Sequence, residues 1–101
     1  MSDQAVVDCL VAARKRIENS ANWGKGNEVF AEDPKNNKDC AQWAIYRVRG
    51  IDHGTYVDGA IRLLKRGAGV THLVEWNDAP ERTHAEVLAA FDKAIELARQ
   101  A

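Results

Sequence analysis

The clearest indication of the fold class is the stretch THAEVLAAFDKAIELA, at residues 83–98. It opens with Thr83 and, three positions later, Glu86, which is the spacing of a capping box: each side chain satisfies a free backbone amide of the other. Apolar residues then recur every three or four positions, the period of a helix with one buried face. The stretch therefore predicts a helix from residue 83 to the C-terminus. Its apolar stripe consists of Val87, Leu88, Phe91, Ala94, Ile95 and Ala98, with Phe91 and Ile95 expected in the core.

The same period occurs three more times, over about 3–19, 39–49 and 55–66. Residues 70–76 fit either a strand or a helical turn, and we favour the helix because a lone strand would lack a pairing partner.

Residues 23–38 lack any period and contain Gly24, Gly26 and an Asp33-Pro34 turn signal, which predicts a long loop. Val29 and Phe30 are expected to pin its middle to the core. The sequence therefore predicts an all-α fold, a compact bundle of about four helices with a long ordered loop between the first two, in a single helical domain over residues 1–101.

Composition narrows the class of protein. The chain has 101 residues, 46% hydrophobic and 29% charged, with a formal net charge of -1, so no bulk field favours nucleic acid or an anionic membrane. No apolar run approaches the roughly 20 residues that span a bilayer, and residues 1–5 lack the pattern of a signal peptide. Cys9 and Cys40 form no disulfide framework and are expected to be free thiols, which favours a cytoplasmic protein without a membrane partner.

The most distinctive segment is WNDAPERT, at residues 76–83. Asp78 and Glu81 have the same capping spacing as Thr83 and Glu86, so a short turn over 79–82 is expected before the last helix. Interlocked capping is the favoured interpretation. The alternative is a ligand-binding cluster with aromatic walls. For Arg82 itself we favour a role in binding, because Thr83 already starts the helix. The candidate binding residues are Trp23, Trp76, Asn77, Asp78 and Arg82.

This segment also resembles a known family. The pattern Trp76-Asn77-Asp78, then Arg82-Thr83, then Glu86-Val87-Leu88, is similar to an uncharacterised family of small proteins of bacteria and their phages, domain of unknown function 6197. NWGKG, at residues 22–26, resembles a Gly-Trp-x-x-Gly-like element of that family, and DCAQWA, at 39–44, resembles its Cys-containing helix start. The resemblance implies a helical fold and carries no activity.

A second candidate surface lies on the helix predicted over 39–49. Trp43 and Tyr46 fall outside its apolar stripe, and Arg47 lies beside them. Burial beneath the long loop is favoured. A partner surface is the alternative, because aromatic residues and Arg are typical interface anchors.

Other site chemistries find weak support. The cysteines and histidines lack the paired spacing of a metal site, no catalytic triad order occurs, and no motif indicates a cofactor. His84 is expected to be partly buried rather than a ligand. The helices predicted over 39–49 and 55–66, with the turn Gly50–Gly54, resemble a helix-turn-helix, but the turn is long and the net charge slightly negative. The basic residues of this region are Arg47, Arg49, Arg62, Lys65 and Arg66.

The sequence therefore favours a non-enzymatic helical binding module. Its partner is a protein or a small ligand, bound through a surface of Trp, Asn, Asp and Arg. One alternative is a small enzyme that uses Asp78, Arg82 and a nearby His; another is a DNA-binding accessory protein, which the charge makes the weaker choice. A homodimer also stays open.

Overall fold

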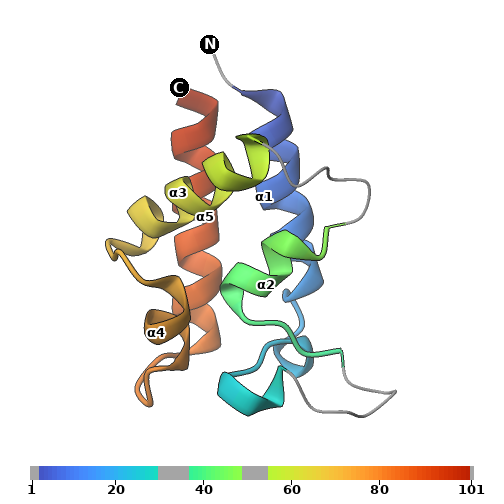
Figure 1. Ribbon diagram of the computed structural model, residues 1–101, viewed down its shortest axis with the longest axis vertical. Helices are drawn as coiled ribbons and strands as arrows, with labels where there is room; N and C mark the ends of the chain where they lie inside the picture. Colours follow the sequence, from blue (N-terminus) through green and yellow to red (C-terminus); the bar gives the residue numbers. More distant parts are fainter. Residues whose placement is uncertain (1–2, 30–36, 49–54, 101) are drawn as a thin grey trace.

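The computed structural model describes residues 3–29, 37–48 and 55–100, and its frame is made by three long helices (Figure 1). These are α1 (Gln4–Arg16), α3 (Thr55–Ala68) and α5 (His84–Gln100). The first turn of α1 and the last turn of α5 lie at the same end of the molecule, so these two helices run antiparallel. Helix α3 packs on both, and α5 is the helix it contacts most.

Shorter elements complete the bundle. These are the helices α2 (Ala41–Tyr46) and α4 (Leu73–Asp78), and two 3-10 turns that lie between α1 and α2 in the chain, η1 (Ser20–Asn22) and η2 (Gly26–Glu28). The described part of the chain contains five α-helices and no strand, which confirms the all-α fold. Helix α4 is the additional helix beyond the four expected from the strongest periodicity. It corresponds to the helix, rather than the strand, that we favoured for residues 70–76.

Helix α2 is shorter than the predicted span of 39–49. It starts after Cys40, because the Cys40 Sγ accepts the Trp43 amide at 3.4 Å and so acts as the N-cap. Arg49 and the predicted turn Gly50–Gly54 lie outside the described residues.

The core joins the inward faces of all five helices. Phe91 is 0% exposed and Ile95 7%, which confirms their predicted place. Leu88 lies at the edge and is only partly buried. The largest fully buried side chains include Leu10, Ile17, Ile45, Leu64, Leu73 and Phe91.

Two glycines shape the end of α3. The sequence predicted that the helix would end before Gly67, but it continues to Ala68, and Gly67 lies where α3 crosses α5: a Cβ there would be 2.5 Å from the Ala90 carbonyl oxygen. Gly69 then ends the helix with a φ of 72°. The Val70 amide donates to the Lys65 carbonyl at 2.9 Å, which is the Schellman pattern of a helix end.

The long loop is closed at its base. The Gly24 amide donates to the Asp39 carbonyl at 3.1 Å, and the Asp39 amide to the Asn22 carbonyl at 2.9 Å. Val29 is buried, as predicted, whereas Phe30 lies outside the described residues. The loop base is therefore fixed to the bundle next to α4.

The two cysteines are free, as the sequence predicted, and both are buried. Burial raises the pKa of the Cys9 thiol to about 11, so this thiol is protonated at neutral pH. None of the described helices is long and apolar enough to cross a membrane.

Candidate functional site

Asn77 is the most connected residue of the segment 76–83 that the sequence singled out. Its side chain is 0% exposed. Its Oδ1 accepts the Trp23 indole N–H at 2.7 Å and the Ala41 amide at 3.1 Å, while its Nδ2 donates to the Gly24 carbonyl at 3.0 Å. Because Ala41 is the first residue of α2, Asn77 satisfies an amide that has no partner inside that helix. One side chain thus connects α4, the loop base and α2.

Asp78 does not cap the turn over 79–82, so that prediction was wrong. It is the last residue of α4, and its Oδ1 accepts the Gly26 amide and the Asn77 Nδ2, both at 3.0 Å. The turn is closed instead by the Arg82 amide, which donates to the Ala79 carbonyl at 2.9 Å. From the loop side, Lys25 Nζ donates to the same carbonyl at 2.7 Å.

Arg82 supports Trp76. Its Nε donates to the Trp76 carbonyl at 2.9 Å, and its guanidinium lies 4.6 Å from the centre of the Trp76 ring. Its second bond, at 2.9 Å, goes to Glu86, and the side chain is only 16% exposed. These contacts leave the guanidinium little freedom to meet a ligand.

The start of α5 confirms the predicted capping box. The Glu86 amide donates to the Thr83 hydroxyl at 3.2 Å, and the Thr83 amide donates to a Glu86 carboxylate oxygen at 3.0 Å. The backbone and side-chain bonds from Thr83, and then the charge of Arg82, lower the pKa of Glu86 below its usual value. His84 is partly buried, as expected: its ring nitrogen donates to the Ile17 carbonyl at 2.6 Å.

The structure joins Trp23, Asn77 and Asp78 through hydrogen bonds, and it places Arg82 against Trp76. We call Trp23, Asn77, Asp78 and Arg82 the polar corner. The hydrogen bonds of these four side chains go to backbone groups, to one another and, from Arg82, to the Glu86 carboxylate. This arrangement fits the favoured interpretation, in which the polar residues of the segment start and join helices.

The second candidate surface is partly exposed. The rings of Trp43 and Tyr46 are 5.5 Å apart, and the Arg47 guanidinium lies 5.3 Å from the Trp43 ring. Arg47 also donates to the buried carboxylate of Asp39 at 2.6 Å, where Arg16 donates at 3.0 Å. Arg47 therefore has a structural partner.

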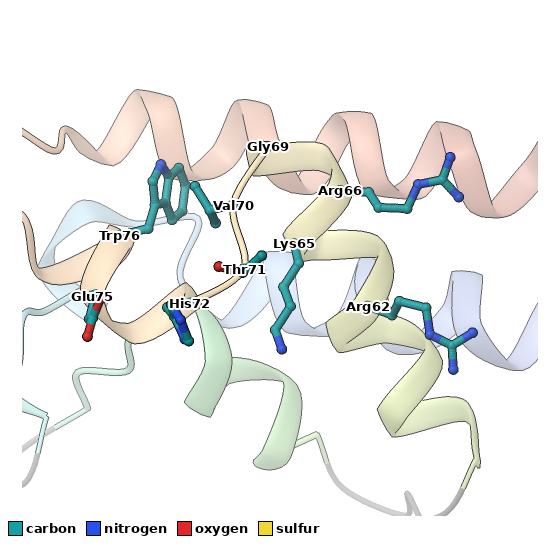
Figure 2. A pocket seen from close by; sticks show the side chains of 9 residues that line it. All are labelled: Arg62, Lys65, Arg66, Gly69, Val70, Thr71, His72, Glu75 and Trp76. Atoms are coloured by element: carbon teal, nitrogen blue, oxygen red, sulfur yellow. The ribbon is translucent and has the colours of Figure 1, made fainter.

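A groove of about 880 Å³ opens between the second half of α3 and α4, and we call it the α3–α4 groove. Figure 2 shows Trp76 and Val70 together at one end and the basic side chains of α3 towards the other. Of the five candidate binding residues, Trp76 lines this groove. The lining consists of Arg62, Lys65, Arg66, Gly69, Val70, Thr71, His72, Glu75 and Trp76.

The three cations of the groove differ from most others in the bundle. Within residues 3–29, 37–48 and 55–100, the side chains of Arg62, Lys65 and Arg66 make no hydrogen bond and no ion pair. Cations elsewhere are bonded to carboxylates or carbonyls, among them Arg14, Arg16, Lys25, Arg47 and Arg82. The described cations that share this lack of partners, Lys15, Lys93 and Arg99, lie on α1 and α5, outside the groove lining.

Two smaller hollows adjoin the groove. One, of about 340 Å³, lies between α2 and α4 and includes Gln42 and Val74; the other, of about 410 Å³, lies between α2 and α3 and includes Tyr46 and Ile61. Lys65 lines all three. The indented surface therefore continues from α4 across α3 to α2.

In the sequence, the groove cations stand out only as the basic charge of the DNA-binding alternative, and no pattern assigns His72 or the Gly69–Thr71 turn to a site. A row of basic residues on a helix is usually a solvated face, and the groove beside it depends on how α3, the turn at Gly69 and α4 are arranged. In the described residues, no three His, Cys, Asp or Glu side chains are placed to hold a metal ion.

Comparison with known proteins agrees with the resemblance seen in the sequence. No curated protein and no solved structure matches the chain. A family model does match, over residues 1–97, and this covers nearly all of the helical bundle and the whole of the groove. The chain therefore belongs to the family of unknown function DUF6197.

Proposed function

We propose that this protein is a non-enzymatic binding module whose site is the α3–α4 groove, and that its partner carries negative charge. The observation that carries the proposal is a set of cations without a partner among the described residues, Arg62, Lys65 and Arg66, beside a hollow of about 880 Å³. That volume lies within the range of ligand sites, roughly 300–1,000 Å³.

The polar corner supports this site indirectly. Trp76 supplies an aromatic wall of the groove, and Arg82 fixes it from outside the lining through the bond to its carbonyl and the contact with its ring. Asn77 and Asp78 attach α4 to the loop base. The Trp, Asn, Asp and Arg residues of the sequence hypothesis thus keep a role in binding: Trp76 meets the partner, and the others hold Trp76 in place.

The chemistry of the groove suits binding. Its cations provide attraction to anions that is not already used by an internal carboxylate, and apolar surface from Trp76 and Val70 can be covered by a partner. Among the described residues that line the groove, Glu75 is the one acidic residue. The groove therefore has a positive side along α3 and an apolar end at α4.

The experiment compares two triple variants by calorimetric titration with sodium triphosphate at low salt. Arg62→Gln/Lys65→Gln/Arg66→Gln removes the groove cations, and the matched control Lys15→Gln/Lys93→Gln/Arg99→Gln removes three other unpartnered cations. We expect the wild type and the control to bind the anion and the groove variant to lose binding. Equal binding by both variants would contradict the proposal, because bulk charge would then explain it.

A second titration, with duplex DNA, addresses the DNA-binding alternative. Binding that falls steeply with salt and disappears in the groove variant would assign the site to DNA instead. The net charge of -1 gives the whole protein no field that favours such binding.

A further inference from the structure

We infer that the partner of the α3–α4 groove is an acidic protein segment in extended conformation, with alternating acidic residues and one apolar side chain that packs against Trp76. This inference rests on the proposed function and names the class of partner. It is carried by the spacing of the cations, the apolar end of the groove and the continuity of the surface.

The cations are spread along the groove rather than gathered at one point (Figure 2). Arg62 and Arg66 lie four residues apart on α3, which separates them by about 6 Å along the helix axis. In an extended chain, alternate side chains lie on one side at intervals of roughly 6.6 Å. Two acidic residues at alternate positions therefore match Arg62 and Arg66, and Lys65 next to Arg66 adds a further positive charge to the row.

The apolar end selects a hydrophobic side chain. Figure 2 shows Trp76 and Val70 side by side, and Gly69 beside them has no side chain to fill the space. Arg82 covers part of the Trp76 ring, and the ring still lines the groove. An aliphatic side chain of the partner, placed before its acidic residues, would cover the exposed apolar surface.

The continuity of the surface favours a chain over a small molecule. The three adjoining hollows share Lys65, so a partner that enters at Trp76 can run past Lys65 towards Ile61 and Tyr46. Glu75 and Asp58 line this path and repel acidic residues near them. They therefore set the register, because the acidic residues of the partner must stand opposite α3.

The test uses short peptides, so that its main comparison does not depend on variants that could fail to fold. The probe is acetyl-Leu-Ser-Glu-Ser-Glu-Ser-Glu-amide, added to the full-length ¹⁵N-labelled protein at low salt. One control replaces Leu by Gly, and a second keeps the composition but places the three Glu side by side. We expect amide shifts within residues 62–76 and weaker binding of the Gly control by roughly tenfold or more, the effect of one buried aliphatic side chain. The contiguous control should also bind more weakly.

A charge-reversal variant tests whether the cations of the groove pair with acidic residues of the partner. Arg62→Glu/Arg66→Glu should lose the acidic probe and gain binding to the same peptide with Lys in place of Glu. Binding of triphosphate together with equal binding of the Leu and Gly peptides would overturn this inference and leave the proposed function standing. Absence of binding by both triphosphate and peptide would overturn both. Sedimentation tests for a dimer. If the wild type is a dimer and the groove variant is a monomer, the groove binds a second copy of this chain, and the inference is overturned.

Discussion

The polar corner and the α3–α4 groove meet at Trp76, yet they treat polar side chains in opposite ways. In the corner, buried Asn77 makes hydrogen bonds to three other segments, and Arg82 is held by a carbonyl and a carboxylate. In the groove, the cations of α3 have no partner among the described residues. The corner therefore holds the fold together, whereas the groove leaves its cations unpaired among the described residues.

This difference indicates which polar residues of a small helical domain are candidates for a binding site: those without an internal partner. The segment with the most distinctive residue pattern, 76–83, uses its polar groups internally. The ordinary basic row of α3 is the one that has interactions left to make. A polar group already paired inside the protein must break that pair before it binds a ligand, which costs about as much as the new bond provides.

The largest effect is expected from Asn77→Ala. It leaves the Trp23 N–H, the Ala41 amide and the Gly24 carbonyl without their partner, and each buried unsatisfied group costs about 1–3 kcal/mol. The free energy of unfolding, measured in urea, should fall by about 3 kcal/mol or more. The exposed Asn27→Ala should change it by less than about 0.5 kcal/mol. A small effect of Asn77→Ala would remove the structural role of the corner.

Arg82→Ala should lower the free energy of unfolding by about 1–2 kcal/mol, because the Trp76 carbonyl loses a charged donor and the Trp76 ring loses its cover. Arg82→Lys should restore little of it, since an ammonium cannot bond and stack in the same planar way. If Arg82→Ala keeps its free energy of unfolding but loses binding of the anion, the result would support the expectation from the sequence that Arg82 contacts the ligand itself.

Thr83→Ala removes the N-cap of α5 and should cost about 1 kcal/mol in thermal or urea unfolding. Thr83→Ser keeps the hydroxyl and should recover most of this loss. If alanine and serine behave alike, the capping box contributes nothing measurable and α5 is held by its apolar stripe alone.

Glu86 makes a smaller contribution that depends on pH. Its pKa is lower in the folded protein than its usual value of 4.5, so its stabilising effect is present above that value. The effect is lost as pH falls through the lower, folded value. In acid unfolding below about pH 4.5, the wild type should lose stability more steeply than Glu86→Gln. Parallel curves would show that Glu86 titrates as it does in the unfolded chain.

The smallest effect is expected in the groove. Arg62→Gln/Lys65→Gln/Arg66→Gln should leave the free energy of unfolding unchanged or raise it by up to about 0.5 kcal/mol, because Arg62 and Arg66 repel each other one turn apart. Together with the loss of stability in Asn77→Ala, this result would show that the polar corner stabilises the fold and that the groove cations do not. A loss above about 1 kcal/mol would mean that these cations serve the fold.

The sequence predicted the fold class well because helical periodicity and the capping box are local signals. The stripe of α5 placed Phe91 correctly without any knowledge of its neighbours. The end of α3 was misplaced, since Gly67 is needed for a contact with Ala90 that no local pattern reveals. The role of Asp78 was missed for the same reason: its partner, the Gly26 amide, is 52 residues away.

The site was less predictable than the fold. Trp76 was identified from its conspicuous segment and does line the groove. Lys65, which lines all three hollows, carries no mark in the sequence, because a lysine on a helix surface is unremarkable until the neighbouring elements are placed around it. The groove is a property of how α3, its turn at Gly69 and α4 are arranged.

The close crossing at Gly67 has a consequence for interpreting related sequences. A side chain larger than hydrogen at this position would meet the Ala90 carbonyl, so the close crossing of α3 and α5 depends on glycine here. The direction in which the basic row points is thereby tied to the direction of α5. In a relative, a larger residue at the equivalent position would signal a changed helix crossing, and there the basic residues of α3 could not be assumed to face the same groove.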